Sequence, residues 1–259
     1  MHVKEIFDLK GKTVIITGGS VGLGAQMAVA VAEAGANVVI AARKVDRCTD
    51  MCAKIEKDCG TRAIAVACDA SKEEDCQKLI DVTMEEFGKI DVLVNNAGIA
   101  WVADSMNFPM DKWQKVLALN LNGTFQLSMM AGRVMKNQGY GKIVNTASIG
   151  ALGGDLPENA NSVAYTASKG AVVSMTKDLA VKWARYGITV NAIAPGWFPT
   201  SMNDKLLEQM APQIMPRIPL ARYGGENDLK GVIVFLASAA SNYMTGQLVV
   251  VDGGQTSMV

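Results

Sequence analysis

Apolar, β-branched runs alternate with longer amphipathic segments along nearly the whole chain. The runs predict seven strands, at residues 13–17, 37–42, 63–67, 90–94, 142–146, 188–193 and 248–251. Polar and apolar residues do not alternate within them, which is typical of strands buried on both faces, as in a parallel sheet. The order of strands and helices therefore predicts an α/β fold, a doubly wound, Rossmann-type parallel sheet with helices on both faces.

Local signals mark the ends of two of the intervening helices. Ser71 is followed three residues later by Glu74, a capping box that predicts a helix start at Ser71. A helix over about residues 22–34 is expected to end at Ala34, because Gly35 can adopt the left-handed conformation that follows a helix. No linker, repeat or low-complexity tract interrupts the pattern, so we expect one domain over residues 1–259.

The length and composition are typical of a globular protein with a sizeable hydrophobic core. Of its 259 residues, 49% are hydrophobic and 19% charged. The 25 basic and 25 acidic residues cancel, so charge gives no indication of nucleic acid or a charged membrane as a partner. The segment MHVKEIFDLKGK lacks the apolar core of a signal peptide, and no uncharged apolar run has the length of a membrane span. We therefore expect a cytoplasmic protein.

The number and spacing of the cysteines and histidines limit which catalytic and metal sites the chain can form. The five cysteines form no CxxC pair and are odd in number, which indicates reduced thiols. Cys48 and Cys52 would share a helix face and could in principle hold a metal, but tight zinc sites normally show close Cys/His pairs, so no metal site is predicted. The single histidine, His2, lies near the terminus. This excludes a Ser-His-Asp or Cys-His catalytic group.

A glycine-rich turn, TGGSVGLG at residues 17–24, follows the first predicted strand. Backbone amides at the start of the next helix, together with the helix dipole, stabilise a pyrophosphate there. Gly18, Gly22 and Gly24 give the spacing GxxxGxG rather than the better-known GxGxxG. The alternative is a tight turn whose glycines only permit packing between helix and strand.

The end of the second predicted strand supports the dinucleotide interpretation. About twenty residues beyond the loop, where an Asp or Glu would accept hydrogen bonds from a ribose 2′-hydroxyl, the sequence has Arg43 and Lys44. Two cations favour a 2′-phosphate, so NADP(H) is predicted over NAD(H). The alternative is an exposed start to the next helix.

Residues suited to proton transfer follow the later strands. The fourth strand is followed by NNAG, Asn95 to Gly98, and the fifth ends near Ser148. Tyr165 and Lys169 have the spacing YxxxK, which places them on one helix face. A phenol with its pKa near 10 is a poor base, and a nearby ammonium is expected to lower that pKa. Tyr165 could then exchange a proton with a carbonyl or alcohol, and Ser148 could hydrogen-bond the developing alkoxide.

Together these residues resemble the short-chain dehydrogenase/reductase superfamily, whose glycine spacing is TGxxxGxG. The resemblance spans residues 9–254 and includes NNAG, LNLNG, YTASK and the APG at 194–196. It implies the catalytic residues Asn120, Ser148, Tyr165 and Lys169, with Asn120 holding a water that relays protons through Lys169. It also implies an adenine contact at Asp69, a ribose contact at Lys169, and a homotetramer. The full cofactor site so implied comprises Gly18, Ser20, Gly22, Leu23, Gly24, Arg43, Lys44, Asp69, Asn96, Ala97, Gly98, Tyr165, Lys169, Pro195, Gly196, Phe198 and Thr200.

Two segments are expected to determine the substrate. Residues 149–164 are rich in Gly, Pro and Asn and predict an irregular loop over the site that forms a substrate wall. The alternative is an exposed turn without a role in binding. Residues 197–225 match the part of the family that closes over substrate, with Trp197, Met202, Met210 and Met215 as apolar surface and Arg217 and Arg222 for an anionic group. Trp101 is a further candidate wall. These side chains could equally only pack the lid.

The leading functional prediction is an NADP(H)-dependent 3-oxoacyl thioester reductase, since the chain resembles bacterial 3-oxoacyl-acyl-carrier-protein reductases. The alternative is a sugar-acid, polyol or cyclic alcohol dehydrogenase similar to gluconate 5-dehydrogenases. A different class is a nucleotide-binding regulator without turnover. A hydrolase is disfavoured because no GxSxG turn is present.

Overall fold

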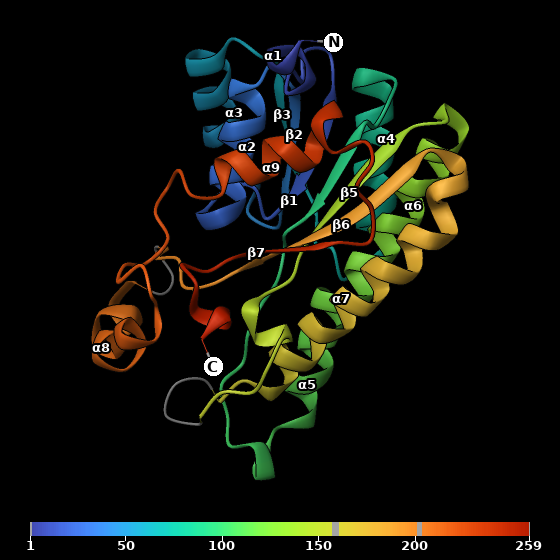
Figure 1. Cartoon of the computed structure of the whole chain (residues 1–259). Helices are drawn as coiled ribbons and strands as arrows, with labels where there is room; N and C mark the ends of the chain where they lie inside the picture. Colours follow the sequence, from blue (N-terminus) through green and yellow to red (C-terminus); the bar gives the residue numbers. More distant parts are fainter. Residues whose placement is uncertain (1, 157–160, 201–203, 259) are drawn as a thin grey trace.

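The computed structural model describes residues 2–156, 161–200 and 204–258 (Figure 1). Its strands form one seven-stranded sheet in the order β3-β2-β1-β4-β5-β6-β7, and every pairing is parallel. The doubly wound sheet is therefore confirmed, with the strand order reversing between β1 and β4. The strands are β1 Thr13–Thr17, β2 Asn37–Ala42, β3 Ala63–Ala67, β4 Val92–Asn95, β5 Gly141–Thr146, β6 Ile188–Pro195 and β7 Leu248–Val251.

Helices cover both faces of the sheet, as Figure 1 shows. Helices α2, α3 and α9 pack on one face, and α4, α6 and α7 on the other. A π-helical segment, Ala118–Gly123, joins α5 to α6. The helix bounds are α1 Val3–Ile6, α2 Gly22–Glu33, α3 Val45–Cys59, α4 Glu73–Phe87, α5 Met110–Leu117, α6 Thr124–Gln138, α7 Val163–Trp183, α8 Asp204–Ile214 and α9 Lys230–Ala237.

The central strands are apolar at successive positions because each face of the sheet has its own core. In β1, Val14 and Ile16 pack toward α2 and α9, while Ile15 packs toward α4 and α6. In β4, Val92 and Val94 take the first face and Leu93 the second. Side chains alternate between faces along a strand, so continuous hydrophobicity is what a sheet covered on both sides requires.

The predicted capping box at Ser71 is wrong. Helix α4 begins at Glu73, and its N-cap, Lys72, makes no side-chain capping bond. Ser71 instead donates from its amide and its hydroxyl to Asp69 Oδ1, at 3.1 and 2.7 Å. Asp69 therefore captures the serine in a turn before the helix, which the local sequence signal did not distinguish from a cap. The other boundary is confirmed: Ala34 is the C-cap of α2, and Gly35 follows with φ +97°.

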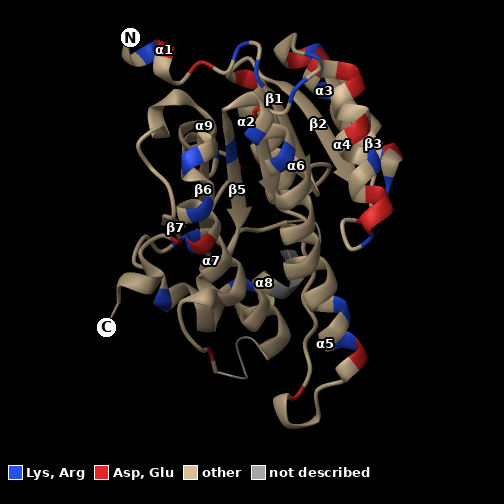
Figure 2. Cartoon of the chain, turned by 90° about the vertical axis from the view of Figure 1, so that its right-hand side faces the viewer, with Lys and Arg blue, Asp and Glu red and all other residues tan. Residues whose placement is uncertain are grey.

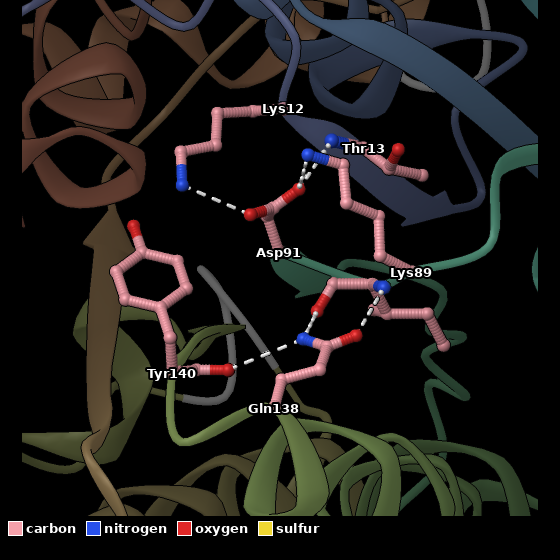
Figure 3. Close-up of polar contacts among 7 residues, drawn as sticks. Lys12, Thr13, Lys89, Asp91, Gln138 and Tyr140 are labelled. Carbon is pink, nitrogen blue, oxygen red and sulfur yellow. Dashed lines mark hydrogen bonds and ion pairs between the residues drawn. The ribbon is translucent and has the colours of Figure 1, made fainter.

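A polar cluster fastens the amino ends of β1, β4 and β5, opposite the glycine loop (Figure 3). Asp91 accepts from Lys12 Nζ and from the Thr13 amide, both at 2.9 Å, and forms an ion pair with Lys89 at 3.3 Å. Gln138 exchanges hydrogen bonds with the backbone of Ile90. Burial opposes the charge of Lys12, but Asp91 and Tyr140 together outweigh burial and raise the pKa of Lys12.

Lys142 is a buried cation in β5, where only 1% of it is exposed. Its ammonium donates to Ser241 Oγ at 3.1 Å, and no acidic side chain of the described residues pairs with it. Burial, together with the positive charge of Lys12, lowers the pKa of Lys142 to about 8. Burying this ammonium without an ion pair therefore costs folding free energy.

Charge on the surface is mixed. Figure 2 shows acidic and basic residues side by side along α3 and α5, without a face of one sign in that view. Among the described helices, none combines the length and apolarity needed to span a membrane.

Candidate active site

The glycine loop joins β1 to α2 and leaves no room for side chains at its closest approach. Gly18 and Gly22 have φ values of +66° and +56°, which favour glycine. A Cβ at Gly24 would lie 2.2 Å from the Gly18 carbonyl oxygen and 2.5 Å from Asn96 Nδ2. The first turn of α2 therefore presses directly on the loop, which requires glycine at position 24.

The segment after β4 holds this loop. Thr17 Oγ1 accepts from the amides of Asn96 and Ala97, each at 3.0 Å. The Asn96 side chain donates back to the carbonyls of Thr17 and Gly18, at 3.0 and 3.3 Å. Thr17 had no predicted role, yet it connects β1 to NNAG. The signal for it was its position as the last residue of the first strand, directly before the glycines.

Asn95 directly precedes Asn96, but its side chain makes hydrogen bonds inside the protein. Its side chain donates to Ser128 and to Asn145, both at 2.9 Å, and Asn145 in turn donates to Thr176. These bonds join β4 and β5 to α6 and α7. Asn95 was not assigned to the cofactor site, and its bonds give it a structural role between β4 and β5.

Arg43 and Asp69 end neighbouring strands, β2 and β3, at the same edge. Burial opposes the charge of Asp69, but bonds from Ser71 and the positive charges of Arg43 and Lys72 outweigh it and lower its pKa. Arg43 is exposed, and none of the described side chains hydrogen-bonds to its guanidinium. Lys44 is exposed too and forms the N-cap of α3. The carboxyl end of β2 is therefore followed by two exposed cations.

Cys48 was not assigned to the nucleotide site, yet it contacts the loop. Its thiol is fully buried, donates to the Lys44 carbonyl at 3.6 Å and interacts with Ser20, and burial raises its pKa. The sequence placed Cys48 only on a helix, since the contact with Ser20 depends on how α3 folds back over the loop. Within the described residues, no group of three or more His, Cys, Asp or Glu side chains could hold a metal ion.

Ser148, Tyr165 and Lys169 come together at the carboxyl end of β5. The Tyr165 phenol interacts with the Ser148 side chain, and Ser148 Oγ accepts from the Gly150 amide at 3.2 Å. Lys169 Nζ donates to the Thr146 carbonyl at 2.6 Å and lies 5.6 Å from the centre of the Tyr165 ring. The YxxxK spacing on α7 therefore produces the expected grouping.

The electrostatics of this group differ from the prediction. Burial raises the pKa of Tyr165, and the bond with Ser148 offsets only part of that rise. Burial also lowers the pKa of Lys169 to about 8. The expected lowering of the Tyr165 pKa by Lys169 is therefore wrong for this arrangement, because the removal of both groups from water dominates. Tyr165 holds its proton at neutral pH.

Asn120 lies beneath this group in the π-helical segment. Its side chain exchanges bonds with the amide and carbonyl of Ile99, both at 2.9 Å, and donates to Ser168 Oγ at 3.0 Å. A Cβ at Gly98 would lie 3.3 Å from Asn120 Oδ1 and 3.5 Å from Lys169 Nζ. The geometry places Asn120, Gly98 and Lys169 together, as predicted; the water relay remains a prediction.

The segment after β6 reaches back to the glycine loop. Pro195 ends the strand, and a Cβ at Gly196 would lie 2.8 Å from Asp252. Thr200 approaches the loop, since its Cγ2 would lie 3.1 Å from a Cβ at Gly22. Phe198 is buried, with 5% exposed, and packs in the core beside Gly224. Its side chain therefore supports this segment from below.

The apolar lid residues pack on one another. Leu207, Ile214 and Ile218 form a buried group, here called the lid cluster, together with Trp197, Met210, Met215 and Tyr223. Tyr223 also donates to the Leu207 carbonyl at 2.9 Å. Packing of the lid was the alternative left open for Trp197, Met210 and Met215, and the structure favours it. Met202 lies outside the described residues, and Trp101 is 40% exposed beneath the Lys112 ammonium.

Comparisons with known proteins agree with this geometry. A family model described as enoyl-(acyl carrier protein) reductase matches residues 18–256. A solved short-chain type dehydrogenase/reductase from Mycobacterium marinum is 38% identical with a TM-score of 0.94, covering 98% of this chain and 99% of that one. The chain belongs to the short-chain dehydrogenase/reductase superfamily.

Several relatives in this superfamily carry specific names. The chain is 39% identical to the 2-dehydro-3-deoxy-D-gluconate 5-dehydrogenase of Dickeya dadantii, over 97% of this chain and 98% of the relative. It is 38% identical to a 3-oxoacyl-[acyl-carrier-protein] reductase of Synechocystis, over 95% and 97% of the two chains. A gluconate 5-dehydrogenase from Burkholderia cenocepacia, solved in complex with NADP and tartrate, is 36% identical with a TM-score of 0.93 and full coverage of both chains (100% and 100%). The short-chain dehydrogenase/reductase fold and oxidoreductase class are therefore established for this chain.

Proposed function

We propose that the chain interconverts the keto and secondary alcohol forms of a sugar acid, with NADP(H) as its cofactor. The grouping of Ser148, Tyr165 and buried Lys169, at the edge that carries the glycine loop, supports the reaction type. The Dickeya relative and the Burkholderia structure support the sugar acid. This favours the alternative over the leading prediction of a thioester reductase, which the Synechocystis relative keeps as a second candidate.

The residues fit a dinucleotide. Gly18 and Gly24 keep the loop backbone free of side chains where a Cβ would collide, which is what close approach of a pyrophosphate requires. Exposed Arg43 supports binding of a 2′-phosphate, since its guanidinium has unused donors. When bound, NADP(H) supplies or accepts the hydride.

The chain's own residues would manage the proton. Tyr165 is protonated at neutral pH, so its phenolic oxygen is ready to donate a proton to a carbonyl oxygen. Ser148 interacts with the same phenol and can stabilise the charge that develops on substrate. Lys169 is held by the Thr146 carbonyl and keeps its positive charge near the ring, which stabilises the phenolate once the proton has left.

The test is absorbance of the reduced cofactor with NADPH or NADH and a panel of 5-keto-D-gluconate, an acetoacetyl thioester and an uncharged cyclic ketone. Tyr165→Phe should abolish turnover while NADPH binding remains, because it removes only the transferable proton. Tyr243→Phe is the matched control, since Tyr243 is fully exposed. Turnover of the thioester alone would replace the sugar-acid proposal with the second candidate. Cofactor binding without any turnover would favour a regulator.

A further inference from the structure

An ion pair joins the two segments expected to determine the substrate. Arg217, at the end of the 3-10 turn Met215–Arg217 in the lid, donates from Nη1 to Asp155 Oδ1 at 2.8 Å. Asp155 lies in the segment that follows Ser148 and the turn Ile149–Ala151. The residues are 62 positions apart in sequence, so the contact exists only because the lid folds against the segment that follows Ser148.

Of the two lid arginines, Arg217 has more donors left to offer a ligand. Arg222 makes two bonds to Asp228, at 2.5 and 3.1 Å, and a third to the Tyr223 carbonyl. Among the described residues, Arg217 is hydrogen-bonded to Asp155 alone, through one nitrogen. A guanidinium carries five N–H donors and suits a carboxylate with two of them. Arg217 therefore uses one of its donors on Asp155 and keeps the others for a ligand.

Both side chains of the pair are exposed enough for a competing anion to reach them. The Arg217 side chain is 40% exposed and that of Asp155 is 21% exposed. A pair with this much exposure contributes little stability, about 1 kcal/mol or less, so a competing anion can displace it. Asp155 shows that the space between wall and lid accepts a carboxylate against Arg217.

We propose that Arg217 binds the carboxylate of the substrate and that Asp155 occupies its guanidinium until substrate arrives. This inference rests on the proposed sugar-acid activity and deepens it: the substrate is selected as an anion by one lid arginine. It assigns opposite effects to the two partners. Removing Arg217 removes the anchor for the substrate, whereas neutralising Asp155 removes the competing carboxylate.

The experiment compares 5-keto-D-gluconate with its methyl ester, which retains the ketone and lacks the charge. Arg217→Leu should raise KM for the acid by about 10- to 100-fold, the value of a charged hydrogen bond, and leave KM for the ester nearly unchanged. Asp155→Asn should lower KM for the acid by about 2- to 5-fold. Arg133→Leu on α6 is the matched control, since Arg133 is an exposed arginine on a helix outside the lid. Equal changes for acid and ester would place the pair in lid packing alone and overturn the proposal.

A second measurement separates this inference from the proposed function. Binding of gluconate to the protein with NADPH, followed by calorimetry, requires no turnover. If no sugar acid is oxidised or reduced but gluconate binds and Arg217→Leu weakens its binding at least 10-fold, the activity is wrong and the carboxylate site stands. If gluconate does not bind to the unsubstituted protein, or binds equally to Arg217→Leu, the carboxylate site is wrong whatever the activity.

Discussion

The buried lysine of β5 gives a prediction about stability. The Lys142 pKa is near 8 instead of its ordinary 10.5, a difference that corresponds to a cost of about 3 kcal/mol for the charged form. Lys142→Met keeps the length of the side chain and removes the charge. It also loses the bond to Ser241, worth about 1 kcal/mol. Ser241 still donates to the Leu236 carbonyl at 3.0 Å, so no donor is stranded. We expect a gain of about 1 to 2 kcal/mol in the free energy of unfolding at pH 7.

The same lysine fixes the pH dependence. The unfolded chain keeps the proton up to about 10.5 and the folded chain releases it near 8, so the unfolded state binds more protons between these values. Stability of the unsubstituted protein therefore rises with pH in that window, whereas the Lys142→Met protein has no titrating group at this position and lacks that rise. The advantage of Lys142→Met should shrink by about 2 kcal/mol between pH 7 and about pH 9.5.

Urea unfolding at one protein concentration measures both values. Lys182→Met is the matched control, since that lysine is 64% exposed and paired with Asp178; it should change stability by less than about 0.5 kcal/mol. An advantage that is the same at both pH values, or a Lys142→Met protein less stable at pH 7, would refute the reasoning from burial.

Three further predictions concern the site and the sheet. Arg43→Ala should weaken NADPH binding by about 10-fold or more and NADH binding far less, because only NADPH carries the 2′-phosphate; equal losses in fluorescence titration would contradict this. Because burial raises the Tyr165 pKa, ketone reduction should fall and alcohol oxidation rise as pH increases through the alkaline range, and pH–rate profiles in both directions would check it. Asp91→Asn should lower the free energy of unfolding by about 2 to 4 kcal/mol, since it leaves the Lys12 ammonium without its carboxylate; an unchanged urea midpoint would show that the cluster contributes nothing.

Much of the fold follows from patterns local to each strand. The apolar runs at 13–17, 37–42, 63–67 and 248–251 match β1, β2, β3 and β7 residue for residue, because a strand covered on both faces has little room for polar positions. The β4 run began two residues early in the prediction, since Ile90 is apolar, yet Ile90 and Asp91 belong to the polar cluster that precedes the strand.

The remainder depends on contacts between distant residues. Nothing in KIVNT indicates that Lys142 is buried, because that depends on the helix end at Ser241 packing over β5. YxxxK predicts that Tyr165 and Lys169 share a face, but the direction of their pKa shifts depends on how deeply the whole chain buries them. The Arg217–Asp155 contact likewise requires the lid and the wall to meet, which no local pattern encodes.

The lid cluster has a consequence for how this chain can diversify. Leu207, Ile214 and Ile218 pack mainly with lid neighbours such as Met215. The apolar side chains of the lid cluster are therefore buried largely against one another. A segment with such internal packing behaves as a local cooperative unit, able to open while the rest of the protein remains folded. We therefore expect that recombination can replace it with another self-packed segment and leave the fold around Ser148, Tyr165 and Lys169 in place.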